Sequence, residues 1–364
     1  MLRLINEYRR VAGVPPVLVD PKLAQGCSEH ARYMVLNRGK PQMYSINAHR
    51  QDPSLPGATP AGAECGKRAV LYPSINDLRS AVRGWMGTIY HRAPIIAPNI
   101  DKVGIGSSRL PTSIKRLAVA LRFVYGRAAA SAWPVAYPAN GQTNLPINFV
   151  SESPTPIPPA GSATPGYPFT LQFPPYDSLT NISGTLKDAA GKPVPIYFSS
   201  PEKVASKYNN QLGLVAMIPQ QTLRAGTSYT ASVTATWKGK RQTWTSKFST
   251  IKRRVVDATD EKALLESVGL PIRIRGVVKR TSRFTAGLIH IKLEGPAGPP
   301  RTRPILTLDV QVPRHILLPA LNLPKNTKYF PMRGKTVEID GTPAYIFRTL
   351  RVDTNPQSRI KMLP

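Results

Sequence analysis

Proline limits what this chain can fold into more than any other residue type does. It fills 38 of the 364 positions, which is about twice its usual share. Because proline fixes φ and lacks a backbone N–H, such a content favours β structure with extended connections. A chain of this length is also too long for one ordinary hydrophobic core, so we expect two or three domains.

Basic residues outnumber acidic ones strongly. The chain has 49 Lys and Arg against 20 Asp and Glu, a net charge of +29. This charge would attract nucleic acid, acidic glycans or an anionic cell envelope, but it fits a generally basic proteome equally well. No stretch approaches ~18 consecutive apolar residues, so we expect no transmembrane helix. Residues 1–12 lack an apolar signal region, so a secreted or envelope-associated form would have lost its signal peptide from this numbering.

The first part of the chain, residues 1–127, has the pattern of an α plus β domain. Asp20 followed by Pro21 is a helix-start signal, with an N-cap acid and proline at the first helical position. Apolar periodicity supplies the other elements. The expected elements are helices over 2–12, from Pro21 to Gly39 and over 76–90, a loop-like stretch over 42–67, and strands over 102–106 and 116–125.

The remaining sequence predicts a linker and two β domains. Residues 128–166 are rich in Pro, Ala, Ser and Thr and predict a semi-rigid linker, parts of which pack on a neighbour. Short alternating strands over 167–250 favour an antiparallel β-sandwich. Residues 251–364 show about five strands with the longest connection between the third and fourth, which favours a small closed barrel of the oligonucleotide/oligosaccharide-binding (OB) type.

Several short motifs follow one another in the first 125 residues. They are Asn6-x-Tyr8-Arg9, His30-Ala31-Arg32-Tyr33-Met34, a single His49, Thr59-Pro60-x-Gly62 with Glu64, Ala81-Val82-x-x-Trp85-Met86-(x)4-His91-Arg92, and Val103-Gly104-Ile105-Gly106. In this order they resemble the CAP superfamily (cysteine-rich secretory, antigen 5, pathogenesis-related), particularly its bacterial branch. The resemblance implies a secreted α-β-α sandwich with a central cavity, which often holds two histidines and two acids.

The resemblance carries three residues into that cavity: His49, Glu64 and His91. No second acid stands between Trp85 and His91, and Thr88 is the expected occupant of its place. Arg92, next to His91, would repel a divalent cation if it pointed inward, so we expect it to be exposed and to point outward.

Two imidazoles and a carboxylate in one cleft could bind Zn²⁺ with an open position for water, or form a hydrogen-bonded polar network. Without a second acid the set favours binding over catalysis. We therefore expect a non-catalytic binding or adhesion protein whose cleft takes a small apolar or metal-assisted ligand. The competing hypothesis is a metal-assisted hydrolase that uses His49, Glu64 and His91.

The other candidate residues lie outside this set. Cys27 and Cys65 fit one disulfide or two buried thiols about equally well. The pieces Pro168-Phe169-Thr170-Leu171 and Trp244-x-x-x-Phe248-x-Thr250 resemble bacterial immunoglobulin-like domains. The last segment carries cations that would form an anion- or nucleic-acid-binding face, or simply a solvated basic surface. They are Arg273, Arg275, Lys279, Arg280, Arg283 and Lys292.

Overall fold

A computed structural model provides the structure of the chain, and it divides into two compact units. It describes residues 1–75, 77–109, 117–126, 132–161, 164–205, 211–252, 254–267, 272–283, 288–294, 308–313, 332–346, 349–353 and 360–363. The first unit holds the described residues up to Lys252, and the second holds those from Arg254 onward. Among these residues, every helix is too short or too polar to cross a membrane.

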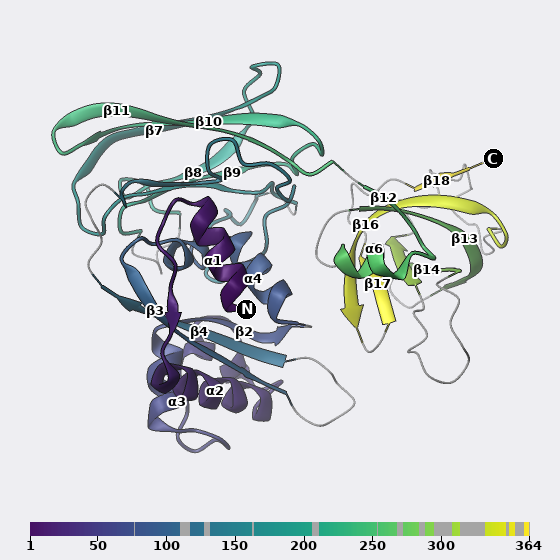
Figure 1. The fold of residues 1–364 in the computed structure, drawn as a ribbon, viewed down its shortest axis with the longest axis horizontal. Coiled ribbons are helices and arrows are strands. Elements are labelled where there is room, and N and C mark those ends of the chain that lie inside the picture. Colours follow the sequence, from purple (N-terminus) through teal and green to yellow (C-terminus); the bar gives the residue numbers. More distant parts are fainter. Residues whose placement is uncertain are drawn as a thin grey trace. The chain divides into compact units, whose positions relative to one another are not determined.

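The first unit begins with a three-layer α-β-α domain. Its elements are α1 (Leu2–Val11), β1 (Leu18–Val19), α2 (Pro21–Leu36), the 3₁₀ helices η1 (Pro41–Met43) and η2 (Ser45–His49), α3 (Pro60–Lys67), β2 (Ala69–Ile75), α4 (Leu78–Met86), α5 (Arg92–Ile95), β3 (Ile100–Ser108) and β4 (Leu117–Tyr125). The strands form one sheet in the order β1-β3-β4-β2. Figure 1 shows α1 and α4 on one side of this sheet and α2 and α3 on the other.

Strand β4 explains why the sheet is covered on both faces. Val119 and Leu121 point into one buried cluster together with Trp85, whereas Ala118 and Ala120 point into a second cluster with Met34. Successive side chains of a strand face opposite sides, so an uninterrupted apolar strand needs a layer on each. Small residues on the α2 side allow close approach: a Cβ at Gly106 of β3 would overlap the backbone of Cys27.

The stretch over 42–67 is more regular than the predicted loop. Helix α3 begins at Pro60, and the hydroxyl of its N-cap Thr59 accepts a hydrogen bond from the Gly62 N–H at 3.0 Å. This is the start signal seen at α2, where the Asp20 carboxylate accepts from the Leu23 N–H at 3.1 Å. The loop prediction was therefore wrong for α3, because the Thr-Pro pair carries the same information as the Asp-Pro pair.

Two antiparallel sheets complete the first unit. Their strands are β5 (Val135–Tyr137), β6 (Phe169–Gln172), β7 (Leu179–Asp188), β8 (Ile196–Ser199), β9 (Leu214–Pro219), β10 (Ser228–Trp237) and β11 (Lys240–Ser249). One sheet has the order β5-β6-β9-β8 and the other β11-β10-β7. Strand β10 alternates buried and half-buried residues along its whole length, as a strand with one covered face does. The inner side chains of both sheets share one buried cluster, and the two sheets together form the β-sandwich of this unit.

The segment predicted as a linker is an integral part of this unit. Its residues 135–137 form β5, which pairs with β6, and Leu145 and Ile147 are buried. The N–H of Val150 donates to the Gly87 carbonyl at 2.9 Å. Because Trp85 of the first domain and Phe169 of the sandwich belong to one buried cluster, the two cores are continuous.

The described residues of the second unit form one sheet and a short helix. Its elements are β12 (Val255–Asp257), α6 (Glu261–Glu266), β13 (Ile272–Arg283), β14 (Leu288–Leu293), β15 (Leu308–Pro313), β16 (Thr336–Ile346), β17 (Thr349–Asp353) and β18 (Ile360–Met362). The seven strands follow the order β12-β13-β14-β15-β17-β16-β18, with an additional pairing between β13 and β16. Parts of the predicted strands over 286–294, 304–312 and 343–352 lie outside the described residues.

Candidate functional site

His49 and His91 line one cleft of the N-terminal domain. His49 ends η2, and His91 lies immediately before α5. The cleft has a volume of about 150 Å³. Its walls are formed by Ser45, Ala48, Leu71, Tyr72, Pro73, Trp85, Thr88, Ser151, Glu152 and Ser153. The structure thus brings together the two histidines that the motif order placed in one cavity.

The first imidazole is held by a backbone carbonyl. Nδ1 of His49 lies 2.9 Å from the carbonyl oxygen of Gly66. A carbonyl only accepts, so Nδ1 carries the hydrogen and Nε2 keeps its lone pair. Burial, followed by the positive charge that His91 can carry, lowers the pKa of His49. His49 is therefore a neutral imidazole at neutral pH, with Nε2 as a hydrogen-bond acceptor.

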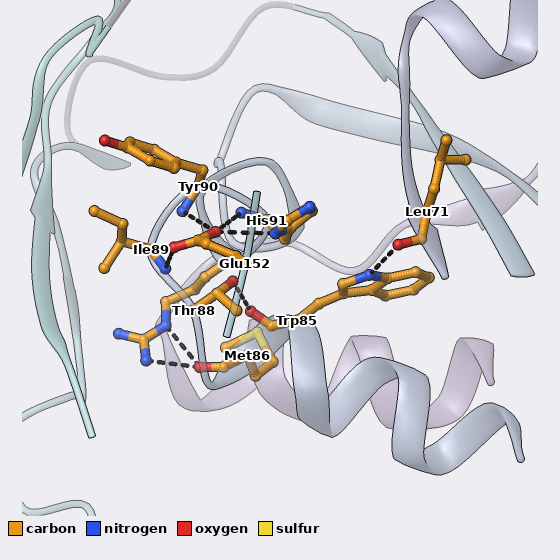
Figure 2. A network of polar contacts seen from close by, with 9 residues as sticks. Leu71, Trp85, Met86, Thr88, Ile89, Tyr90, His91 and Glu152 are labelled. Atoms are coloured by element: carbon orange, nitrogen blue, oxygen red, sulfur yellow. Dashed lines mark hydrogen bonds and ion pairs between the residues drawn. The ribbon is translucent and has the colours of Figure 1, made fainter. Parts of the chain in front are cut away.

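The second imidazole is held by a carboxylate that the sequence did not reveal. Nδ1 of His91 lies 2.9 Å from Oε2 of Glu152, whose side chain has no exposed surface. Figure 2 shows the other ring nitrogen of His91 on the far side of the ring from Glu152. A carboxylate on Nδ1 fixes the orientation of the ring and leaves Nε2 as the atom available to a ligand.

Glu152 is also bound by the backbone of the loop that carries His91. Its Oε1 accepts from the Ile89 N–H at 2.9 Å, and its Oε2 accepts from the N–H groups of Tyr90 at 3.1 Å and His91 at 3.4 Å (Figure 2). Burial and then the charge of Glu152 raise the pKa of Tyr72 to about 12. These hydrogen bonds show that the Glu152 carboxylate positions the loop that carries His91, and that both of its oxygens already act as acceptors within the protein.

Glu64 is not among the described residues that line the cleft. It lies on α3, and its Oε1 is 3.0 Å from Nε of Arg68 and 3.3 Å from an Nη of Arg122. Its side chain is 43% exposed. The neighbouring Cys65 is fully buried and bridged to α2, whereas Glu64 projects from a different side of α3 and stays partly exposed. The assignment of Glu64 to the cleft was wrong, and Glu152 is the carboxylate beside the histidines.

Thr88 and Arg92 are both buried, but of the two only Thr88 is among the described residues that line the cleft. Thr88 is buried in the cleft wall, where its hydroxyl donates to the Trp85 carbonyl at 2.7 Å. Arg92 is fully buried rather than exposed, so the expectation of an outward Arg was wrong. Its guanidinium donates to backbone carbonyls of both domains, those of Met86, Tyr137 and Pro168, at 2.6–3.2 Å. The sandwich covers Arg92, which is why the sequence around it gave no sign of burial.

Cys27 and Cys65 are joined in a disulfide that connects α2 to α3, with their Cα atoms 5.2 Å apart. The residue after Cys65 is Gly66, whose carbonyl holds His49. His30 packs against the same place: its Nε2 donates to the Ala48 carbonyl at 3.0 Å, and a Cβ on Gly66 would overlap its ring. The bridge and His30 thus support the loop that carries His49.

Acid is expected to destabilise the protein through His30. Burial lowers the pKa of His30 to about 4, against about 6.5 in an unfolded chain. Between these values the unfolded state binds more protons, so the stability present above about pH 6.5 falls by about 3 kcal/mol as the pH approaches 4. Urea unfolding of the wild type and of His30→Gln across this range measures the effect. An equally steep loss in His30→Gln would contradict it.

The residues present do not fit the Zn²⁺ ion that two imidazoles and a carboxylate in one cleft could bind. Catalytic zinc sites usually have three protein ligands. Within the described part of the chain, no group of three or more His, Cys, Asp or Glu side chains is placed to hold a metal ion. The one carboxylate beside the two histidines accepts four hydrogen bonds from the chain itself.

The basic residues predicted to form an anion-binding face are partly paired. Nε of Arg273 lies 2.7 Å from Asp340, and an Nη of Arg275 lies 2.6 Å from Glu338, both across the β13–β16 pair. Lys279 and Arg280 are exposed, and Lys292 is half-buried. The side chain of Arg283 lies outside the described residues.

The fold and the cleft define a three-layer α-β-α domain with two histidines in its cavity. Residues 2–124 match the model of the CAP family, described as the cysteine-rich secretory protein family, so this part of the chain is a CAP-like domain. A search of curated proteins found no match. One similar solved structure is CopC from Methylosinus trichosporium OB3b, with 14% identity, 32% of this chain and 89% of that chain covered, and a TM-score of 0.21. A likeness this weak supports no conclusion about fold or function.

Proposed function

We propose that the cleft of the CAP-like domain is a non-catalytic binding site for a small amphipathic ligand. The hydrogen bonding of the two imidazoles supports this proposal: each uses Nδ1 within the protein, which leaves both Nε2 atoms for a ligand. Hydrolysis needs a base that accepts a proton from water, or a metal ion that lowers the pKa of a bound water. Glu152 already accepts four hydrogen bonds, so it is a positioning residue rather than a base. His49 faces the neutral Gly66 carbonyl through Nδ1 rather than a carboxylate that would stabilise an imidazolium, so its Nε2 is better suited to accept a hydrogen bond than a proton.

The walls of the cleft contain apolar and aromatic side chains that would contact the apolar part of a ligand. Tyr72 and Trp85 stack with their ring centroids 5.5 Å apart, and Leu71 lies beside them in the wall. At about 150 Å³ the cleft matches a cavity that admits a benzene-sized molecule. A ligand with an aromatic or aliphatic body and one hydroxyl would place the body on these walls and donate its hydroxyl hydrogen to Nε2 of His49.

Phenol and toluene form a matched pair of probes for this site. We expect phenol to bind the full chain about tenfold more tightly than toluene, because only phenol donates to Nε2. The preference should disappear in His49→Leu and should not change with a metal chelator. Calorimetric titration measures both affinities. Equal binding of the two probes, or a chelator-dependent affinity, would contradict the proposal.

We further propose that the protein works outside the cytoplasm on an anionic surface. The Cys27–Cys65 bridge supports an oxidising compartment, and the charge of +29 supports attachment to an anionic envelope or glycan. In the second unit, the order β13-β14-β15-β17-β16 and the return pairing to β13 support the OB-like arrangement predicted from the sequence. Heparin chromatography of the full chain tests the attachment to an anionic surface. The double variant Lys279→Ala/Arg280→Ala should be retained less strongly than the wild type. Unchanged retention would show that these two residues do not form the attachment surface.

A further inference from the structure

A second and larger pocket lies where the CAP-like domain meets the sandwich. It has a volume of about 500 Å³, within the range of small-molecule sites. Tyr90, Asn99 and Tyr125 line it from the CAP-like domain, and Gln172 and Tyr176 line it from the sandwich. We propose that this pocket binds an uncharged saccharide. Figure 2 shows the rings of Tyr90 and His91 on opposite sides of Glu152, so this pocket is distinct from the histidine cleft.

Three of the residues that line this pocket each have a buried side-chain polar atom without a hydrogen-bond partner among the described residues. These atoms are the hydroxyl of Tyr90, Oδ1 of Asn99 and Oε1 of Gln172. Gln172 is only 7% exposed, so its oxygen is costly to leave unpaired. Buried polar atoms in proteins are almost always paired with the chain, with water or with a ligand. Two amide oxygens and a phenol in one pocket call for a ligand with several hydroxyl donors.

Aromatic rings supply the apolar part of the pocket. Tyr125 is 61% exposed and Tyr176 is 85% exposed, the largest exposure among the described large apolar and aromatic side chains. The backbone of Tyr176 has φ +73°, in the left-handed region that a bulky residue rarely adopts. With 85% of its surface exposed, Tyr176 has little packing against the described residues to offset that strain. Flat, exposed rings of this kind can stack on the apolar C–H faces of a sugar.

Charge decides between saccharides and other polar ligands. None of the described residues that line the pocket is Lys, Arg, His, Asp or Glu. A charged ligand would lose water there without gaining a partner charge, which is costly. The basic surface of the chain (net charge +29) therefore does not extend to this pocket. An uncharged ligand with many hydroxyls and apolar ring faces meets all of these conditions, and a neutral saccharide is such a ligand.

Calorimetric titration of the full chain with maltose, cellobiose and N,N′-diacetylchitobiose tests the proposal. We expect at least one of the three disaccharides to bind. Tyr176→Gly removes the ring and relieves the left-handed backbone, so it should weaken binding about tenfold without loss of folding. Tyr44→Ala, which removes an exposed tyrosine of the CAP-like domain outside the pocket, is the matched control and should leave the affinity unchanged.

Gln172→Met separates a ligand contact from a structural role. Methionine has nearly the same shape but no unpaired oxygen, so the variant should unfold at the same or a higher denaturant concentration while binding the disaccharide about tenfold more weakly. His49→Leu, which tests the histidine cleft, should leave saccharide binding intact, so the two proposals fail separately. Absence of binding for all three disaccharides, or wild-type affinity in both Tyr176→Gly and Gln172→Met, would overturn the proposal.

Discussion

Replacement of Glu152 by alanine is expected to lower the free energy of unfolding by about 3–5 kcal/mol. The change leaves three backbone N–H groups and the Nδ1–H of His91 without an acceptor at a buried position. It also releases residues 151–153 from the wall of the cleft. Urea unfolding followed by tryptophan fluorescence measures the effect, since Trp85 lies in the same wall.

Glu202→Ala is the matched control for this prediction. The carboxylate of Glu202 also accepts backbone N–H groups, those of Asn181 and Ile182 at 3.0 Å, but at an exposed position. Water replaces such an acceptor easily, so we expect a loss below about 1 kcal/mol. Equal losses in the two variants would show that the burial of Glu152 contributes nothing, and the proposed positioning role would be wrong.

Arg92→Met is expected to cost at least about 3 kcal/mol and to weaken the joint between the CAP-like domain and the sandwich. Methionine preserves much of the apolar stem but removes every donor. The carbonyl of Met86 in the CAP-like domain and those of Tyr137 and Pro168 at the sandwich then lose their shared partner. The rings of Tyr137 and Tyr167, each 4.9 Å from the guanidinium carbon, lose a cation–π contact as well.

We expect the urea unfolding of Arg92→Met to separate into two transitions, because the two cores share this buried guanidinium. Limited proteolysis should then cut the chain between β4 and β5, where the CAP-like domain leads into the sandwich. Arg79→Met, at an exposed position on α4, is the control and should change stability by less than about 0.5 kcal/mol. If Arg92→Met unfolds in a single transition with the same urea midpoint as the Arg79→Met control, the prediction is wrong.

Local signals predicted much of the first unit. The Asp20-Pro21 pair fixed the start of α2, and its carboxylate caps the helix as expected. The order of the motifs placed His49 and His91 in one cavity, and both line the cleft. The helix prediction is confirmed because its information lies within a few residues, whereas the placement of the two histidines rests on the family pattern.

The carboxylate of the cleft required information from far along the chain. Glu152 lies 61 residues after His91, in a segment whose composition predicts a linker. One signal was present in the sequence: Glu152 is the one charged residue between Arg127 and Asp177. A lone charge in a long uncharged stretch points to a specific partner. Glu64, by contrast, had a visible local partner in Arg68 at i+4, which holds it on the outer face of α3.

The central claim is that Glu152 orients His91 so that Nε2 faces a ligand. Long-range ¹H–¹⁵N correlation of the imidazoles in the full chain tests it directly, with wild type and Glu152→Gln compared at neutral pH. We predict that Nδ1 of His91 carries the hydrogen in the wild type, as Nδ1 of His49 does against Gly66. In Glu152→Gln, the His91 signals should shift while those of His49 stay in place. A His91 hydrogen on Nε2 alone in the wild type, or identical His91 signals in the two proteins, would contradict the claim.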